Sequence, residues 1–212
     1  NQINPDKLNR SQSTIKRLFD ILLSFCGLIF FSWIIFFSFF IASIDTGKNG
    51  FYKQKRVGKN GKSFFIIKIR TMKDLKGINS TITSKNDPRI TKIGSFFRKY
   101  KIDELPQLIN ILIGSMSFVG PRPDVEGYAD KLQGEERIIL SVRPGVTGPA
   151  TIKYREEENI LSDVEDKYRE TYNNEVIYAD KVKINIEYVK NWSFSRDLCY
   201  IWQTLMGLIK NG

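Results

Sequence analysis

Hydrophobic residues are concentrated in one uninterrupted segment near the start of the chain. Residues 21–44, ILLSFCGLIFFSWIIFFSFFIASI, form a run of 24 residues without a charge between Asp20 and Asp45. As a helix this run is about 36 Å long, more than the roughly 30 Å of a bilayer core. It is too long for the apolar part of a cleaved signal peptide. We predict a membrane helix over residues 16–47, preceded by an N-terminal tail over 1–15.

Positive charge flanks this segment on both sides. Four basic residues lie between Lys7 and Arg17, and residues 48–73 contain nine basic residues and no acidic one. Positively charged flanks stay on the cytoplasmic side of a membrane. A single span would place one basic flank outside, whereas a helix that enters and returns keeps both inside. The charges favour the re-entrant form, bent near Ser32, and leave a single span open.

The remaining residues, 48–212, show shorter patterns. FYKQKRV and SFFIIKI flank Asn60-Gly61 and predict a β-hairpin. Apolar residues at i, i+3, i+4 and i+7 from Leu105 to Leu112 predict an amphipathic helix that begins near Pro106.

Other segments complete the predicted domain. We expect a short basic helix from Gly94, a polar loop over 77–90, an acidic surface segment over 155–170, and helices at about 174–190 and 196–210. The last of these suits either core packing or an interfacial position. The predicted fold class is α+β, mainly helical: a re-entrant membrane helix and a compact cytosolic catalytic domain with a small β-hairpin and interfacial amphipathic helices.

Composition narrows the chemistry. The 33 basic and 23 acidic residues give a net charge of +10, which favours an anionic partner such as a phosphate ester, anionic lipid or nucleic acid. The chain has no histidine, which excludes serine–histidine and cysteine–histidine catalysis and the usual zinc sites. Two cysteines in unrelated segments indicate a reducing compartment rather than a disulfide.

An acidic pair stands in the basic stretch RKYKIDELPQLINILIG. On a helix the side chains of Asp103 and Glu104 would diverge by roughly 100°, so they would serve different purposes. A helix N-terminus and the nearby Arg98, Lys99 and Lys101 would keep Asp103 ionised, as a nucleophile or metal ligand requires. The simpler alternative is that Asp103 only caps the helix.

Two arginines accompany this pair. Arg122 lies between prolines in GPRP, and Arg143 precedes a proline in VRPG. A guanidinium held by its backbone is suited to bidentate binding of phosphate. Together with the membrane helix, these residues suggest a phosphate diester handled at a bilayer.

Several motifs carry a family resemblance. KRLFD, DPRITKIGSFFRKYKIDELPQLINILIGSMSFVGPRP and VRPGVTG closely resemble the bacterial sugar transferases, monotopic polyprenyl-phosphate phosphoglycosyl transferases. The resemblance extends from about Lys16 to the C-terminus, is densest over 87–148, and looks like the small, catalytic-core-only type. It implies transfer of a sugar 1-phosphate from a UDP-sugar to undecaprenyl phosphate with release of UMP, which initiates surface glycan or glycoprotein glycan synthesis.

The resemblance also implies site residues and surroundings. Asp103 matches the nucleophile, which forms an aspartyl-phosphosugar intermediate and lies near a Mg²⁺ cofactor; Glu104 matches its partner acid. Substrate phosphate would be bound by three arginines that match family arginines, Arg98, Arg122 and Arg143, and by Arg70, which stands where many members carry a lysine. The implied setting is the cytoplasmic face of the bacterial inner membrane, in contact with membrane lipid and without nucleic acid; a homodimer is left open.

Three departures from the family pattern stand out. Ser32-Trp33 replaces the usual Ser-Pro at the helix bend, Pro149 and KYREEEN replace a family loop, and Asn185 replaces an Asp. The first assigns the bend to serine-to-backbone bonding and tertiary contacts. The altered loop leaves open which residues contact the nucleotide or sugar. It also leaves open that this chain is a family member without activity. The alternative from a different class is a non-enzymatic, membrane-tethered basic module that binds nucleic acid or acidic lipid.

Overall fold

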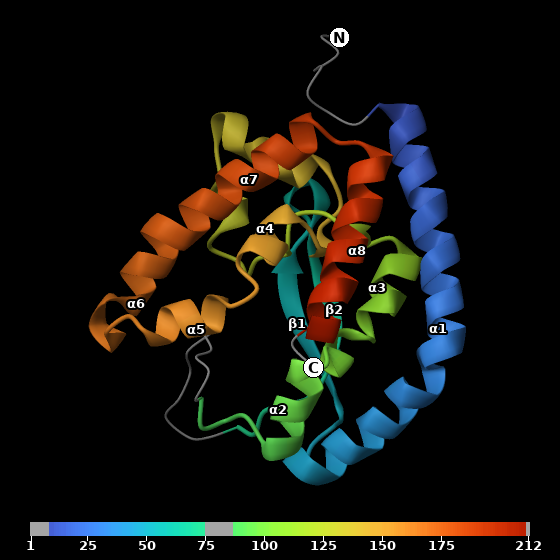
Figure 1. The fold of residues 1–212 in the computed structure, drawn as a ribbon, viewed down its shortest axis with the longest axis vertical. Coiled ribbons are helices and arrows are strands. Elements are labelled where there is room, and N and C mark those ends of the chain that lie inside the picture. Colours follow the sequence, from blue (N-terminus) through green and yellow to red (C-terminus); the bar gives the residue numbers. More distant parts are fainter. Residues whose placement is uncertain (1–8, 75–86, 211–212) are drawn as a thin grey trace.

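A helix of 37 residues, α1 (Arg10–Thr46), forms one side of the molecule. The computed structural model describes residues 9–74 and 87–210 (Figure 1). Asn9 and Gln12 form a reciprocal capping box at the start of α1, and Gly47, with a φ of 69°, ends it. Within the described residues, α1 is the one helix long and apolar enough to cross a membrane. The second half of α1 turns beneath the domain toward α2 (Figure 1).

The predicted hairpin is confirmed. Strands β1 (Phe51–Val57) and β2 (Ser63–Ile69) pair antiparallel, and the 3₁₀ turn η1 (Lys59–Gly61) connects them. Asn60 adopts a left-handed φ of 59° there, a conformation that asparagine tolerates better than most residues.

The basic helix and the amphipathic helix are also present. Helix α2 (Lys92–Lys99) is capped by the Thr91 hydroxyl, and α3 (Gln107–Ile113) begins directly after Pro106. Asn110 is buried on α3, where its side chain accepts from Ile67 N at 3.0 Å and donates to Phe65 O at 2.8 Å. Helix α3 is therefore fastened to the edge of β2.

A second small sheet was not predicted. Strands β3 (Ser117–Val119) and β4 (Gly145–Thr147) pair in parallel. Their junction requires glycine because a Cβ on Gly145 would lie 2.1 Å from the Gly120 nitrogen. The crossing brings the GPRP and VRPG motifs together in space.

The rest of the chain is mainly helical, so the mainly helical α+β prediction is confirmed. The predicted late helices correspond to η5 with α7 and to α8, and most of the predicted polar loop lies outside the described residues. The remaining elements are η3 (Ala129–Lys131), η4 (Gly134–Ser141), α4 (Pro149–Lys153), α5 (Glu157–Ser162), α6 (Asp166–Tyr172), the π-helical η5 (Asn173–Tyr178), α7 (Ala179–Lys190) and α8 (Phe194–Lys210).

Both halves of α1 are attached to the same domain. In the first half, Lys16 forms an ion pair with Asp197 of α8, and Asp20 accepts hydrogen bonds from Ser117 Oγ and Phe118 N, each at 3.1 Å. In the second half, Ala42 packs with Ile69 and Phe97.

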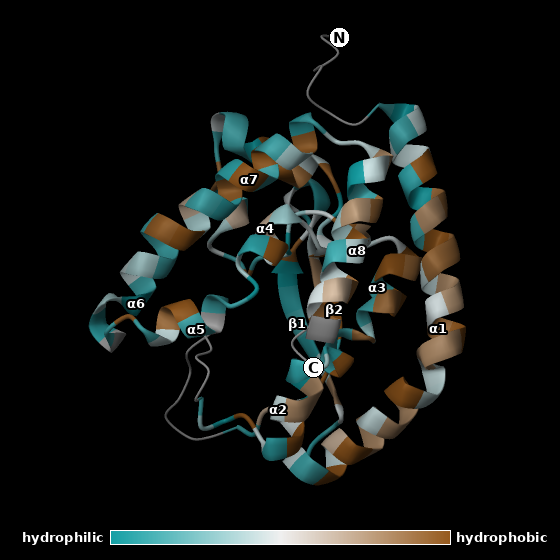
Figure 2. Ribbon diagram, viewed as in Figure 1, coloured by the Kyte–Doolittle hydropathy of each residue, from teal (hydrophilic) through white to brown (hydrophobic). Residues whose placement is uncertain are grey.

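The outer surface of α1 is apolar. Its hydrophobic colouring continues along most of the helix (Figure 2). The exposed large side chains include Leu22, Phe25, Ile29, Phe30, Trp33, Phe36, Phe37, Phe40 and Ile44. Nothing within the described protein covers this surface, which is the expected behaviour of a helix that contacts lipid.

Candidate active site

Asp103 lies in a tight turn between two helices. It belongs to η2 (Ile102–Glu104), a 3₁₀ turn that follows Lys101 in a left-handed conformation with a φ of 56°. Since Pro106 occupies the N-cap position of α3, Asp103 is not the cap of that helix. Asp103 is only 8% exposed, and its Oδ1 has no hydrogen-bond partner among the described residues. A buried carboxylate oxygen without a donor is costly, and such groups are typical of functional sites.

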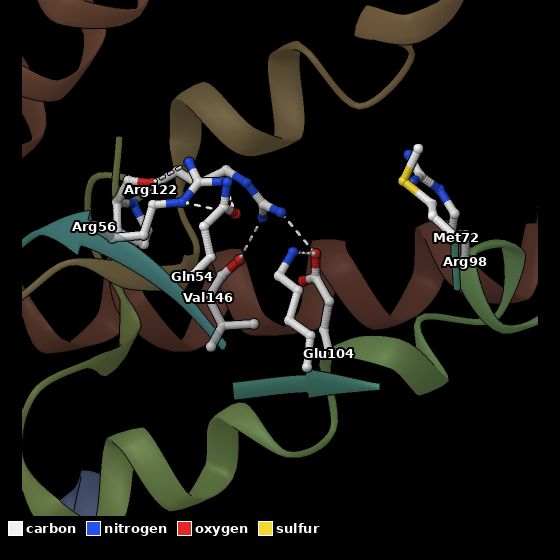
Figure 3. Close-up of polar contacts among 9 residues, drawn as sticks. Gln54, Arg56, Met72, Arg98, Glu104, Arg122 and Val146 are labelled. Carbon is white, nitrogen blue, oxygen red and sulfur yellow. Dashed lines mark hydrogen bonds and ion pairs between the residues drawn. The ribbon is translucent and has the colours of Figure 1, made fainter. Parts of the chain in front are cut away.

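Glu104 is held by two cations. Its Oε1 accepts from Arg122 Nη2 at 2.6 Å and from Lys68 Nζ at 3.3 Å (Figure 3). The side chain of Glu104 is 9% exposed, whereas that of Arg122 is 41% exposed. Arg122 therefore faces both the buried carboxylate and solvent, where a substrate can approach.

The two adjacent carboxyls differ in their protonation. Burial, followed by the charge of Glu104, raises the pKa of Asp103 to about 6, although Lys68, Lys101 and Arg98 oppose this. Burial also works against ionisation of Glu104, but Arg122 and Lys68 overcome it and hold the Glu104 pKa well below its usual value. The nearby cations do favour the ionised form of Asp103, as expected, but burial outweighs them and raises its pKa, which stays below 7.

The position of Arg122 follows from the β3–β4 crossing. Arg122 leaves the C-terminal end of β3 between two prolines, and its Nη1 also lies 3.5 Å from Val146 O of β4. Behind it, Arg56 of β1 donates to Pro123 O at 3.1 Å and to the Gln54 side chain (Figure 3). The hairpin and the parallel strands together fix the direction of this guanidinium.

The other predicted arginines do not join Glu104. Arg98 projects from α2 toward the Met72 sulfur, 3.9 Å away, and lies apart from Glu104 in Figure 3, yet it is close enough to affect the Asp103 pKa. Arg70 donates to Asn49 O at 2.8 Å and stacks over Tyr52. Arg143 donates through Nε to Gly114 O at 2.8 Å, at the far end of α3 from Asp103.

Lys68 contacts Glu104 in the candidate site and was not predicted from the sequence. It lies in β2, within the otherwise apolar stretch SFFIIKI, and only 19% of its side chain is exposed. Burial lowers its pKa, and Glu104 opposes that change. A single lysine inside an apolar strand was the available signal, because a buried cation needs an anionic partner.

The altered family positions lie toward α7. Pro149 begins α4, and from this helix and its end Lys153 Nζ and the Tyr154 hydroxyl both donate to Asp180, each at 2.7 Å. Asn185 is 7% exposed, and its Oδ1 has no partner among the described residues. Neither change touches Asp103 or Glu104 directly.

Comparison with known proteins places the chain in a family. The model for "Bacterial sugar transferase" matches residues 11–211. The chain belongs to the bacterial sugar transferase family. It is thereby classed among transferase enzymes, as the resemblance predicted.

Three relatives illustrate the range of this family. The Exopolysaccharide production protein ExoY of Rhizobium meliloti is 35% identical over 90% of this chain and 83% of its own length. The Undecaprenyl-phosphate galactose phosphotransferase of Salmonella typhimurium is 33% identical over 92% of this chain, and the UDP-glucose:undecaprenyl-phosphate glucose-1-phosphate transferase of Escherichia coli is 32% identical over 90%. The chain spans only 40% and 39% of the length of these last two proteins.

Proposed function

We propose that this chain is a phosphoglycosyl transferase that moves a sugar 1-phosphate from a UDP-sugar to undecaprenyl phosphate and releases UMP. Two relatives are named for transfer to undecaprenyl phosphate, one for galactose and one for glucose. These names support the acceptor and leave the sugar open. The product, an undecaprenyl diphosphosugar, would begin assembly of a surface or glycoprotein glycan.

Asp103 is the proposed nucleophile. Its Oδ1 is buried and has no donor within residues 9–74 and 87–210, and with a pKa of about 6 the carboxyl group is roughly nine-tenths ionised at pH 7. The carboxylate oxygen bonds to the β-phosphorus of the UDP-sugar, and the bond from that phosphorus to the bridging oxygen breaks. UMP leaves with the electron pair, and an aspartyl-phosphosugar remains. An oxygen of undecaprenyl phosphate then attacks the same phosphorus and releases Asp103.

Glu104, Arg122 and Lys68 form the proposed phosphate-binding part of the site. Arg122 is anchored to Glu104 at 2.6 Å, so its direction is set before substrate arrives. Its exposed guanidinium surface and the Lys68 ammonium both carry positive charge toward the diphosphate. Preset charges of this kind stabilise a phosphoryl-transfer transition state without reorganisation.

A magnesium ion is compatible with the carboxylate at residue 103. Within residues 9–74 and 87–210 no group of three or more acidic or cysteine ligands is present. Magnesium, however, commonly takes one or two protein carboxylates and completes its shell with substrate phosphate oxygens and water. The unpartnered Oδ1 of Asp103 suits such a ligand. When bound, the ion would neutralise diphosphate charge and stabilise the leaving UMP.

A re-entrant α1 on the cytoplasmic face of the inner membrane is the proposed topology. Lys16 and Ala42 contact the same domain but are separated by 26 helical residues, a distance of about 39 Å for a straight helix and more than a bilayer core of about 30 Å. A domain on one side of the membrane contacts both residues when α1 enters and returns, and this supports the re-entrant form. A cysteine at Gln12 and another at Lys48 should both react with a membrane-impermeant thiol reagent only from the cytoplasmic side. Reaction at Gln12 from outside would establish a full span.

The Asp103→Asn variant tests the covalent mechanism. UMP release from UDP-glucose and UDP-galactose, with undecaprenyl phosphate and Mg²⁺, should fall by at least about 1,000-fold because the amide cannot displace UMP. Without acceptor, the intact mass of the wild-type protein should increase by one sugar phosphate, and that of the variant should not change.

A matched control separates chemistry from folding. Asp163→Asn changes the exposed aspartate that follows the last residue of α5 and should leave UMP release unchanged. Turnover by Asp103→Asn close to that of the control would refute the nucleophile. If wild-type protein releases no UMP from any UDP-sugar but binds acidic vesicles, the non-enzymatic alternative holds.

A further inference from the structure

A polar cavity lies between the first turns of α1 and the rest of the domain. Its volume is about 210 Å³, and its walls include Lys16 and Asp20 of α1, Lys59 of the hairpin turn, and Ser141 and Arg143. Asp103, Glu104, Lys68 and Arg122 do not line it. The cavity is therefore separate from the proposed active site, and the reaction above gives it no role.

Two residues that line this cavity each have a buried oxygen without a hydrogen-bond partner among the described residues. Asp20 is 1% exposed; its Oδ1 accepts from Ser117 and Phe118, while its Oδ2 has no hydrogen bond among the described residues. The Ser141 hydroxyl, also buried, has none either. Buried polar groups in folded proteins are nearly always satisfied by protein, water or ligand. A ligand with a hydrogen-bond donor could therefore satisfy the unpartnered carboxylate oxygen of Asp20.

The same cavity is rich in positive charge. Lys16 is paired with Asp197 at one edge, and Lys59 and Arg143 stand at others. Arg143 donates through Nε to Gly114 O, and neither of its Nη nitrogens has a hydrogen-bond partner among the residues that the structure describes. A guanidinium with two unused nitrogens asks for an oxyanion. A ligand that fits this cavity therefore needs negatively charged oxygens for Arg143 and a hydrogen-bond donor for Asp20.

We propose that this cavity binds a phosphate group that carries its own N–H or O–H donor. The phosphate oxygens accept from Arg143 and Ser141, and the donor of the ligand reaches Asp20 Oδ2. At about 210 Å³ the cavity is smaller than the usual 300–1,000 Å³ of a drug-sized ligand site and suits a headgroup. Basic pockets beside membrane helices on the cytoplasmic side are known to bind the phosphate of anionic lipid headgroups.

This inference goes beyond the transfer reaction and requires only that α1 contacts the bilayer. Such a ligand would add to the contacts that Lys16 and Asp20 already make between the base of α1 and the domain. Phosphatidylethanolamine has the required phosphate and N–H donors. Phosphatidylcholine has the same phosphate but no donor on its quaternary nitrogen, so the two lipids form a matched pair of probes.

Thermal unfolding of the full chain in detergent tests the site. Short-chain phosphatidylethanolamine should raise the melting temperature with a half-saturating concentration at least about tenfold below that of phosphatidylcholine, the difference expected for one charge-assisted hydrogen bond. Inorganic phosphate and free phosphoethanolamine provide the other two arms. If they act as strongly as the lipid, the site holds but its ligand is soluble; equal effects of the two lipids would overturn the proposal.

Two variants locate the effect. Ser141→Ala removes a hydroxyl that makes no hydrogen bond to the described residues, so the melting temperature without ligand should not change. Binding of phosphatidylethanolamine should become about tenfold weaker. Asp20→Asn can keep the acceptor for Ser117 and Phe118 but loses the carboxylate charge, and it should remove the preference between the two lipids. Ser11→Ala, on the exposed side of the same helix, is the control. Unaltered binding by Ser141→Ala would place the ligand elsewhere, even if Asp20→Asn failed to fold.

Discussion

Arg122 and Arg143 stand in nearly the same local sequence, yet they serve opposite ends of α3. Arg122 contacts Glu104, which precedes the helix, and Arg143 contacts Gly114 O, which follows it. The Arg122 guanidinium faces a carboxylate and solvent, whereas the Arg143 guanidinium donates to one backbone carbonyl group. A flanking proline sets the backbone of an arginine, but it does not determine the arginine's partner.

The side chains, and not the backbones, account for the difference. The GPRP and VRPG motifs meet where β3 and β4 cross, and Gly145 N donates to Pro121 O there at 2.8 Å. From this meeting point the Arg122 side chain reaches Glu104, whereas the Arg143 side chain reaches Gly114 O.

Of the substitutions at these two arginines, replacement of Arg122 should cause the largest loss of activity. Arg122→Ala should lower kcat/KM for UMP release by at least about 100-fold, because it removes a preset positive charge at the diphosphate. Glu104→Gln, measured beside it, tests the link between the two residues. A double variant no worse than Glu104→Gln alone would show that Arg122 acts through Glu104; a multiplied loss would show separate roles. Arg196→Ala, an exposed arginine on α8, is the control and should change kcat/KM little.

The pH dependence of activity should distinguish the Asp103 end of α3 from the Arg143 end. With the Asp103 pKa at about 6, kcat/KM should fall about tenfold for each pH unit below that value. Arg143→Met should lower kcat/KM by the same small factor at every pH and leave the apparent pKa of the profile unchanged. A profile that is flat down to pH 5 would contradict an ionised Asp103 as nucleophile.

The same pKa gives a stability prediction with a definite sign. Between about pH 4, the ordinary aspartate value, and pH 6, folded Asp103 binds its proton more tightly than the unfolded chain does. The free energy of unfolding therefore falls as the pH rises through this range, and Asp103→Asn should lose that part of the fall. Burial also raises the pKa of Asp124 to about 6, so the measurement is best made in an Asp124→Asn background.

Much of the fold was predictable because its signals are local. The apolar run of α1, the alternation and Asn60-Gly61 turn of the hairpin, and the helical spacing of α3 depend on neighbours a few residues apart. Strands β3 and β4 have three residues each, too few to show the alternation of apolar and polar residues that identifies a strand. Their pairing joins residues 28 positions apart in the sequence. Whatever depends on that pairing could not be read from the chain.

The candidate site divides in the same way. Asp103 and Glu104 were found from their neighbours, and Arg122 from its prolines, but the contact between Glu104 and Arg122 is tertiary. Lys68 reaches Glu104 from another strand, so its role was not visible. The Asp103 pKa depends on burial, which sequence neighbours do not reveal, so the cations near Asp103 in the sequence could not give the direction of its shift.

Arg143→Met should have the smallest effect on turnover and a measurable effect on folding. The substitution removes a hydrogen bond at 2.8 Å and a positive charge from the carbonyl end of α3, together worth about 1–2 kcal/mol of unfolding free energy. Arg17 still donates to Ile111 O at 2.6 Å and to Leu112 O at 2.7 Å, so the helix end keeps part of its cap.

Urea unfolding in detergent measures the loss, and kcat/KM per folded molecule should fall less than about threefold, far below the loss at Arg122. A drop as large as that of Arg122→Ala, without loss of stability, would mean that substrate phosphate reaches Arg143. The two ends of α3 would then belong to one binding site.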